Sequence, residues 1–396
     1  MVATGALNAT VNGIITGSII ALGAVSLSLL YSIAEVPNFA HGAMITVGAY
    51  LVFVLNKPSV FLLVSDVPGV AFWFGVPFAL IGGGVLGGAI ELAMFRHFRR
   101  KGVDLITKLI ATMGLALVLR NVVVLLAGGE SQSYETPLVI SNFYDFYLAT
   151  DGVGLRVLQR SGGDVVRLAQ WGYSWTTAAG IAVAGTVAAV TMHRLYARRE
   201  GDVRFVSRRS AAATAFGAVV VVGLALGRGT FVSGATLYAS RVIASLKHVL
   251  IVVTSIAAMA FLSAFLTLTK TGKAMRASAD NLALAEVSGI NTDRVQLVVW
   301  TLAGVLTALA GALFGWFANI HPELGFSLLL PIFAAVILGG ISSPTGAVIG
   351  SYVIGLTMSL GVYFAPFDAS PYRTAFAFVV LLALLLVKPE GLREGY

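Results

Sequence analysis

Apolar segments long enough to cross a lipid bilayer recur along the whole chain, and they constrain its fold more than any other feature. A helix needs about 17–25 mostly apolar residues to span the hydrocarbon core. The chain is 58% hydrophobic and 11% charged, whereas soluble domains carry roughly 25% charged residues. We therefore predict an all-α fold, a polytopic transmembrane helical bundle of about 9–11 spans, some of them short or broken. The predicted spans are residues 9–33, 40–56, 69–95, 105–127, 172–192, 211–227, 248–269, 296–318, 328–341, 344–364 and 373–388.

Several kinds of site are excluded by what the sequence lacks. It has no Cys, so disulfides, thiolate metal sites and Cys nucleophiles are ruled out. The five His residues lie far apart, and no nucleophile–base or metal-ligand spacing occurs, so we expect neither an enzyme nor a metal site. The string "TKTGKAM" is the nearest match to a P-loop, but it lacks the first glycine and the final Ser or Thr of that motif. If ATP drives this chain, we expect the ATP and its Mg on partner subunits.

Basic residues collect in four of the connections between predicted spans. Residues 96–108, 193–209 and 270–294, with the tail from 388, hold 17 of the 26 Lys and Arg residues. If the spans alternate, these connections share one side of the membrane, and their basic excess identifies that side as cytoplasmic. We therefore expect a multi-pass protein of the cell membrane, with its N-terminus outside and its C-terminus cytoplasmic. The net charge of +8 then reflects orientation, and no nucleic-acid partner is expected.

Residues 1–396 are predicted to form a single membrane domain with one long connection outside the cell. That connection, residues 128–171, is rich in Gly, Ser and aromatic residues. Such a composition is compatible with a segment that folds locally, and equally with a plug or a docking surface.

A polar segment on the predicted cytoplasmic side, residues 270–294, has the pattern of an ordered helix. Apolar residues recur at helical spacing over residues 273–288. Gly289 is placed to end the helix in a left-handed conformation, and Ile290 follows as the residue that packs back on the last turn. Asn291 or Thr292 can then cap the next helix. Two interpretations remain open: a surface helix that only connects two spans, or a docking helix for a cytoplasmic partner.

Two other stretches place polar or glycine residues where spans begin or break. In "PNFAHG", Asn38 and His41 bring donors and acceptors to an apolar region. His41 is interpreted either as a packing residue that bonds a neighbouring helix or as a gating residue. Residues 328–355 predict a short helix, a glycine-rich turn and a second helix. This unit is either a pathway element or a simple packed hairpin.

Ionisable residues inside spans require a partner or water. Glu91 and Lys108 lie at similar depths on adjacent predicted spans, so their positions allow them to pair. Arg120, near the outer end of its span, either extends its side chain toward water or faces the pathway.

Four stretches, taken together, resemble the branched-chain amino-acid permeases of ATP-binding cassette (ABC) importers. They are "PNFAHGAMITVGAY" (37–50), "GKAMRASADNLALAEVSGI" (272–290), "LGGISSPTGAVIGSYVIG" (338–355) and "KPEGL" (388–392). They occur in the same order as in the family, and the resemblance extends over roughly residues 1–128 and 246–396. Ser342 departs from the pattern, because the family often has Gly-Ser after the position of Ile341. Residues 129–245 are longer than the family pattern and form an atypical insertion.

The resemblance implies a permease subunit that moves branched-chain amino acids or related small polar solutes across the membrane. It also implies three kinds of partner: a second homologous permease chain, two cytoplasmic ATP-binding subunits and an extracytoplasmic substrate-binding protein. Residues expected to couple to the ATP-binding subunit are Arg276, Ala277, Asp280, Asn281, Ala285, Glu286 and Gly289. Candidates for the translocation pathway or its gate are Asn38, His41, Gly42, Arg120, Gly339, Gly340, Ser342, Pro344 and Gly346.

Two alternative functions are also compatible with the sequence. A urea or short-chain amide permease of an ABC importer shares similar motifs. An ion-coupled secondary transporter is disfavoured, because no predicted span carries a series of acidic or His residues of the kind that relays protons.

Overall fold

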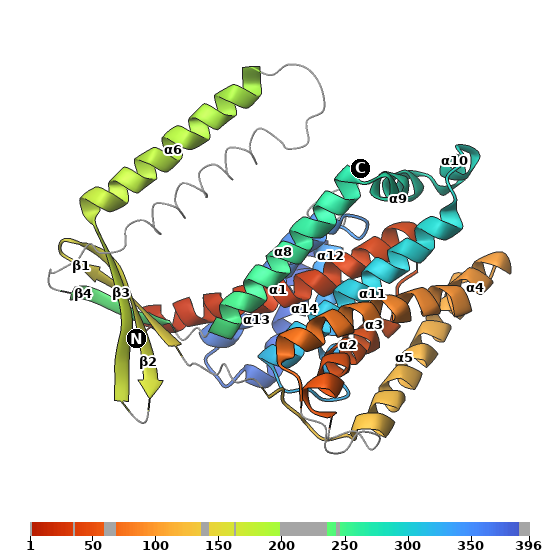
Figure 1. Ribbon diagram of the computed structural model, residues 1–396, viewed down its shortest axis with the longest axis horizontal. Coiled ribbons are helices and arrows are strands. Elements are labelled where there is room, and N and C mark those ends of the chain that lie inside the picture. Colours follow the sequence, from red (N-terminus) through yellow and green to blue (C-terminus); the bar gives the residue numbers. More distant parts are fainter. Residues whose placement is uncertain are drawn as a thin grey trace. The chain divides into compact units, whose positions relative to one another are not determined.

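Two compact units are present in the computed structural model, Met1–Asn8 with Ile140–Leu246 and Ala9–Val139 with Lys247–Tyr396. The structure describes residues 2–34, 36–58, 69–135, 142–161, 164–198, 236–242 and 246–387. Figure 1 shows their helices and strands, coloured along the sequence. The predicted span 211–227 lies outside the described residues.

The larger unit is built from apolar helices, and the predicted helical bundle is confirmed. Six of its helices, in the part of the chain that the structure describes, are long and apolar enough to cross a membrane. Two shorter apolar helices, α2 and α12, coincide with predicted spans that were expected to be short. The helices are α1 (Val2–Ala34), α2 (Ala40–Asn56), α3 (Phe72–Ile90), η2 (Glu91–Phe95), α4 (Arg96–Arg100), α5 (Leu105–Ala127), α8 (Leu246–Leu268), α9 (Lys270–Asp280), α10 (Leu282–Val287), α11 (Thr292–Phe317), α12 (Leu324–Gly339), α13 (Pro344–Phe364), η3 (Ser370–Tyr372) and α14 (Arg373–Val387).

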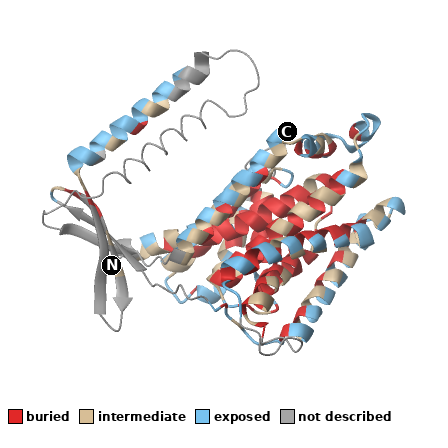
Figure 2. Cartoon of the chain, in the orientation of Figure 1, coloured by how far each residue is buried: buried red, intermediate tan, exposed pale blue. Residues whose placement is uncertain are grey.

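Helix α1 lies at the centre of the larger unit, and other helices cover it. In its most apolar window 94% of residues are buried, compared with 17% in each of α5 and α8. Figure 2 shows this contrast as buried residues along α1 and exposed residues along α5 and α8. The exposed side chains on α5 and α8 are mostly apolar. Such surfaces suit lipid, which offers no hydrogen-bond partners, better than water.

Glycines allow α2, α3 and α11 to approach one another closely. A Cβ atom built on Gly311 would collide with the carbonyl oxygen of Ile45 in α2. A Cβ atom built on Gly304 would collide with the carbonyl oxygen of Gly83 in α3. Close approach of this kind is how membrane helices gain van der Waals contact without a hydrophobic driving force between them. These helices therefore form the tightly packed part of the bundle.

The smaller unit contains a four-stranded antiparallel sheet with the strand order β3-β2-β1-β4. The strands are β1 (Asn142–Ala149), β2 (Gly152–Ser161), β3 (Asp164–Ser174) and β4 (Thr236–Val242), and α6 (Trp175–Arg198) follows β3. Ala149 pairs with Gly152 at the end of the first hairpin, and Ser161 pairs with Asp164 at the end of the second. These strands were not predicted. From the sequence, residues 128–171 are interpreted as a segment that folds locally, a plug or a docking surface. The strands β1 and β2 and most of β3 lie in this range, which agrees with local folding.

Candidate functional site

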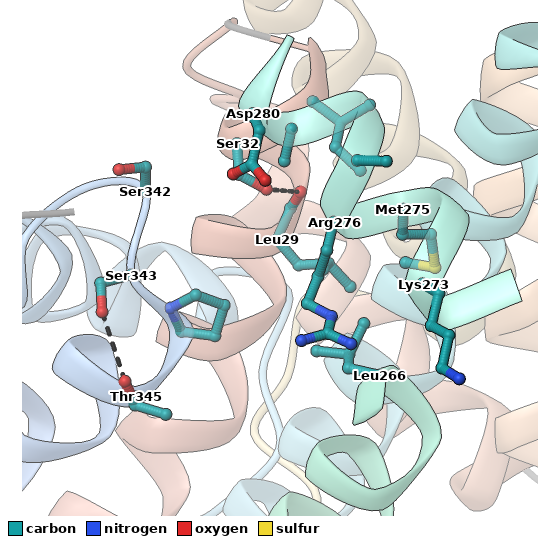
Figure 3. A pocket seen from close by; sticks show the side chains of 14 residues that line it. Leu29, Ser32, Leu266, Lys273, Met275, Arg276, Asp280, Ser342, Ser343 and Thr345 are labelled. Atoms are coloured by element: carbon teal, nitrogen blue, oxygen red, sulfur yellow. Dashed lines mark hydrogen bonds between the residues drawn. The ribbon is translucent and has the colours of Figure 1, made fainter. Parts of the chain in front are cut away.

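A cavity of about 1010 Å³ lies in the larger unit, where α9 faces the turn between α12 and α13. It brings together residues from both predicted sets, because Arg276 and Asp280 come from the coupling segment and Ser342 and Pro344 from the glycine-rich turn. Figure 3 shows their side chains around the open space. The lining residues are Leu29, Ser32, Ile33, Leu266, Lys273, Met275, Arg276, Ala277, Ala279, Asp280, Ser342, Ser343, Pro344 and Thr345.

The turn between α12 and α13 is fixed by local backbone chemistry, as predicted for a helix–turn–helix unit. Gly340 has a φ of +97°, a conformation that side chains disfavour. The Ser343 hydroxyl accepts a hydrogen bond from the Gly346 amide at 3.1 Å and caps α13, whose first residue is Pro344. Gly339 and Gly346 lie so close that a Cβ atom on either would collide with the other's carbonyl oxygen. The first helix begins at Leu324, four residues before the predicted start.

Helix α1 holds this turn in place from the other side. The Ser28 hydroxyl donates a hydrogen bond of 2.9 Å to the carbonyl oxygen of Ile341. One turn further along α1, the Ser32 hydroxyl donates 2.9 Å to the carbonyl oxygen of Leu29 and lies beside Asp280 in Figure 3. The hydrogen bond from Ser28 to Ile341 therefore joins α1 to the turn at this cavity wall.

Helix α9 forms the charged wall of the cavity. The Thr269 hydroxyl caps it by accepting from the Gly272 amide at 2.9 Å, and Met275 and Ser278 are buried beneath it. Arg276 and Asp280 lie one helical turn apart and are exposed toward the cavity. Within the described part of the chain, neither side chain makes an ion pair or a hydrogen bond. Two opposite charges are therefore available to a group that enters the cavity.

The polar segment is two helices, so the prediction of one continuous helix over residues 273–288 is wrong. Asn281 has an extended backbone, with φ −158° and ψ 105°, which ends α9. Its side-chain oxygen accepts from the Leu284 amide at 2.9 Å and caps α10. An Asn side chain competes with the helix for backbone groups and so favours a cap over a helix interior. The predicted coupling residue Asn281 thus marks the break between the two helices and caps both of them.

The predicted stop after the polar segment is confirmed. Gly289 has a φ of +83°, and its amide donates 2.9 Å to the carbonyl oxygen of Glu286. The Ile290 amide donates 3.0 Å to the carbonyl oxygen of Ala285, which completes a Schellman motif. Asn291 caps α11 by accepting from the Arg294 amide at 2.9 Å.

Other members of the predicted coupling set have different surroundings. Ala277 lines the cavity, whereas Ala285 is buried beneath α10. The Glu286 carboxylate accepts a hydrogen bond of 2.7 Å from the Thr292 hydroxyl. The most exposed large apolar side chains of α10 are those of Leu284 and Val287, which are 63% and 87% exposed. Neither residue was among the predicted coupling residues, although an apolar residue close to a helix stop in a polar segment is a signal that the sequence contains.

An ion-pair cluster ties the start of α11 to α4. Asp293 lies 3.2 Å from both Arg96 and Arg99 and 3.7 Å from Arg100. Arg99 also reaches back 2.6 Å to the buried carboxylate of Glu91. The predicted pairing of Glu91 with Lys108 is therefore wrong. Glu91 begins the π-helical turn η2, and the nearest cation is supplied by the same continuous helical segment rather than by the next span.

The predicted residues near the start of α2 form a separate buried cluster. His41 Nε2 lies 2.9 Å from the carbonyl oxygen of Gly23 and 3.1 Å from the Ser26 hydroxyl. A carbonyl oxygen only accepts, so Nε2 carries a proton. Asn38 accepts from the Ala40 amide at 3.0 Å, and Gly42 packs against the backbone of Gly325. The Nε2 contacts are compatible with the packing interpretation of His41, whereas its buried Nδ1 has no hydrogen-bond partner in the described part of the chain. The role of His41 therefore stays a prediction.

Arg120 lies away from both groups. Its guanidinium forms an ion pair with Glu323, the residue just before α12. The site residues predicted for one pathway are therefore divided among the cavity, the His41 cluster and this pair. In the described ranges, no group of His, Asp or Glu side chains is arranged to hold a metal ion.

Comparison with known proteins identifies a family. The model of the "branched-chain amino acid transport system / permease component" family matches residues 9–158 and 161–387. The high-affinity branched-chain amino acid transport system permease protein LivH of Salmonella typhimurium is 25% identical over 382 residues, covering 96% of this chain and 93% of the relative. The corresponding permease protein BraD of Pseudomonas aeruginosa is 23% identical, covering 98% and 95%. A probable LivH of Methanocaldococcus jannaschii is 36% identical over 155 residues, covering 37% and 48%. No solved structure matches.

Proposed function

The chain belongs to the branched-chain amino acid transport permease family, and from that premise we propose that it is the transmembrane permease subunit of an ABC importer. Its cargo is a branched-chain amino acid or a related small polar solute, and its location is the cell membrane. The absence of a P-loop from the sequence supports ATP hydrolysis on separate subunits. The observation that carries the proposal is the cavity. Its lining includes residues of α9, in the polar segment between two spans, and residues of the turn between α12 and α13.

Coupling works through α9 and α10 as two linked elements. Helix α10 contacts a cytoplasmic ATP-binding subunit through the side chains of Leu284 and Val287. Both side chains are apolar and largely exposed, which is typical of a surface that binds another protein. Asn281 transmits the movement to α9, which forms one wall of the cavity. The same assembly includes a second homologous permease chain, a second ATP-binding subunit and an extracytoplasmic binding protein. The N-terminus lies outside and the C-terminus inside.

The transport function is tested by reconstituting the full complex in proteoliposomes and measuring uptake of labelled L-leucine. We expect uptake that requires ATP and is inhibited by excess unlabelled leucine but not by urea. Competition by urea and not by leucine would favour the amide permease. Uptake by the purified single chain, driven only by an ion gradient, would favour a secondary transporter and contradict the proposal.

The docking of α10 is tested with Val287→Asp. A charge at this position opposes burial in an apolar contact, so we expect fewer ATP-binding subunits to co-purify and transport to fall at least tenfold. Leu105→Asp is the matched control, because Leu105 is 49% exposed and begins α5 on the same predicted side. Asp in a first helical turn is favourable, so we expect this change to leave α5 intact. Equal co-purification by both variants would contradict docking through α10.

A further inference from the structure

The charges on the α9 wall of the cavity are arranged for a ligand that carries both signs. Arg276 and Asp280 are four residues apart, a spacing at which helical side chains meet. The order basic-then-acidic is the weaker of the two orientations for such a pair, and no ion pair joins them. Figure 3 shows Arg276 extending into the cavity and Asp280 at its edge beside Ser32. Both charges are thus directed at a shared space.

The rest of the lining is suited to an apolar group. Leu29, Ile33 and Leu266 contribute aliphatic side chains from α1 and α8, and Pro344 contributes its ring from the turn. Binding sites for small molecules usually combine such walls with a few polar groups that fix the orientation of the ligand. The cavity therefore offers a guanidinium, the ammonium group of Lys273, a carboxylate and an aliphatic surface within one space.

We propose that this cavity is an inner binding site, on the cytoplasmic side of the permease, for the amino acid named as cargo in the proposed function. The Arg276 guanidinium binds the α-carboxylate, since its planar donors match a carboxylate. Asp280 binds the α-ammonium group, and Leu29, Ile33 and Leu266 contact the side chain. This inference rests on the proposed function and adds to it the residues that bind cargo on the cytoplasmic side.

The location of the charges on α9 gives the site a means of release. Helix α9 is joined through Asn281 to α10, whereas the opposite wall is held by the hydrogen bond from Ser28 to Ile341. A displacement of α10 therefore moves Arg276 and Asp280 relative to that wall. The two charges would separate from the ligand together, which lowers its affinity when the motor subunits move.

Equilibrium binding to the purified full-length chain tests the site with three probes that differ by one charge each. The probes are L-leucine, L-leucinamide, which lacks the carboxylate, and 4-methylpentanoate, which lacks the ammonium group. We expect Arg276→Gln to weaken leucine binding at least fivefold and to leave leucinamide binding unchanged. Asp280→Asn should weaken leucine binding by a similar factor and leave 4-methylpentanoate binding unchanged. Arg294→Gln, an exposed position outside the cavity, should bind all three probes as the wild type does.

Each outcome decides the inference. Wild-type leucine affinity in both cavity variants would overturn it, as would equal losses for leucine and for the truncated probes. Loss of ATP-binding subunits from the complex with unchanged leucine binding would assign Arg276 and Asp280 to the subunit contact instead. Gel filtration of each variant checks folding, and Arg276→Lys, which keeps the charge, should restore part of the affinity. ATP-dependent leucine uptake by the wild-type complex is measured alongside, so that failure of the site and failure of the proposed transport function give different results.

Discussion

Two polar regions of the larger unit, the His41 cluster and the cavity beside α9, use their polar groups in opposite ways. His41 is fully buried, and its Nε2 is bonded to the carbonyl oxygen of Gly23 on the neighbouring helix. Arg276 and Asp280 are exposed and have no such partner in the described part of the chain. A buried polar group needs a hydrogen-bond partner within the fold, whereas a charged side chain on a cavity wall can pair with a ligand that enters the cavity. This difference is the reason for proposing a packing role for the His41 cluster and a binding role for the cavity.

The tightly packed helices around α2 are where the largest effect is expected. Gly311→Val places side-chain atoms against the carbonyl oxygen of Ile45, a backbone atom that cannot move aside. We expect a destabilisation of more than about 3 kcal/mol and little folded protein on gel filtration after detergent extraction. Gly114→Val in α5 is the control, because no atom lies within 4 Å of the Cβ position there. Comparable yields from both variants would show that the packing of α2 against α11 is looser than described.

Removing the partner of a buried charge should have the next largest effect. Arg99→Gln leaves the Glu91 carboxylate, which is 1% exposed, without its cation. Loss of one member of a buried ion pair costs about 3–5 kcal/mol. Thermal unfolding of the purified protein should therefore begin at a clearly lower temperature. Lys108→Gln should leave the transition unchanged, and the opposite ranking of the two variants would restore the Glu91–Lys108 pairing that the sequence suggested.

The substitution His41→Ala tests whether the His41 cluster contributes to stability and not to solute binding. This change empties a fully buried position and removes one of the hydrogen bonds to the Gly23 carbonyl oxygen, which still accepts from the Ser26 hydroxyl at 2.8 Å. A substitution of this kind costs about 0.5–3 kcal/mol. We expect a lower unfolding temperature but unchanged leucine affinity in the binding assay, because His41 does not line the cavity. His97→Ala, at an exposed position, should change neither quantity. Weaker leucine binding at normal stability would move His41 into the pathway.

Local features of this fold were predictable from the sequence, and contacts between distant segments were not. The stop at Gly289 and the cap at Asn291 depend on hydrogen bonds within a few residues, so the sequence contains them. The break at Asn281 carried a local signal too, but the apolar spacing on both sides masked it. The strands before α6 also had a signal, since Asp151-Gly152 separates two runs rich in aromatic and β-branched residues.

No local sequence pattern predicted the cavity or the ion pair of Glu91 with Arg99. The cavity wall joins residues near 29, 266 and 342, and only the packing of α1, α8 and α12 brings them together. Arg99 reaches Glu91 across the turn η2, whose π-helical geometry changes which side chains share a face. The span predicted over residues 69–95 is expected to be a regular α-helix, and that geometry does not predict the contact between Glu91 and Arg99. The site thus emerges from tertiary structure, and five of its fourteen lining residues had been predicted individually: Arg276, Ala277, Asp280, Ser342 and Pro344.

The smallest expected effect separates the stop after α10 from the charges of α9. Gly289→Ala introduces a side chain at a φ of +83°, where the strain is about 1–2 kcal/mol and no atom obstructs the methyl group. We expect a small loss of stability but a larger loss of coupling, measured as solute transported per ATP hydrolysed by the assembled complex. Gly102→Ala, at a φ of +61° and equally unobstructed, should cost the same stability without changing that ratio. Equal ratios in the two variants would mean that the direction in which α10 ends has no part in coupling, and that α9 alone links the motor subunits to the cavity.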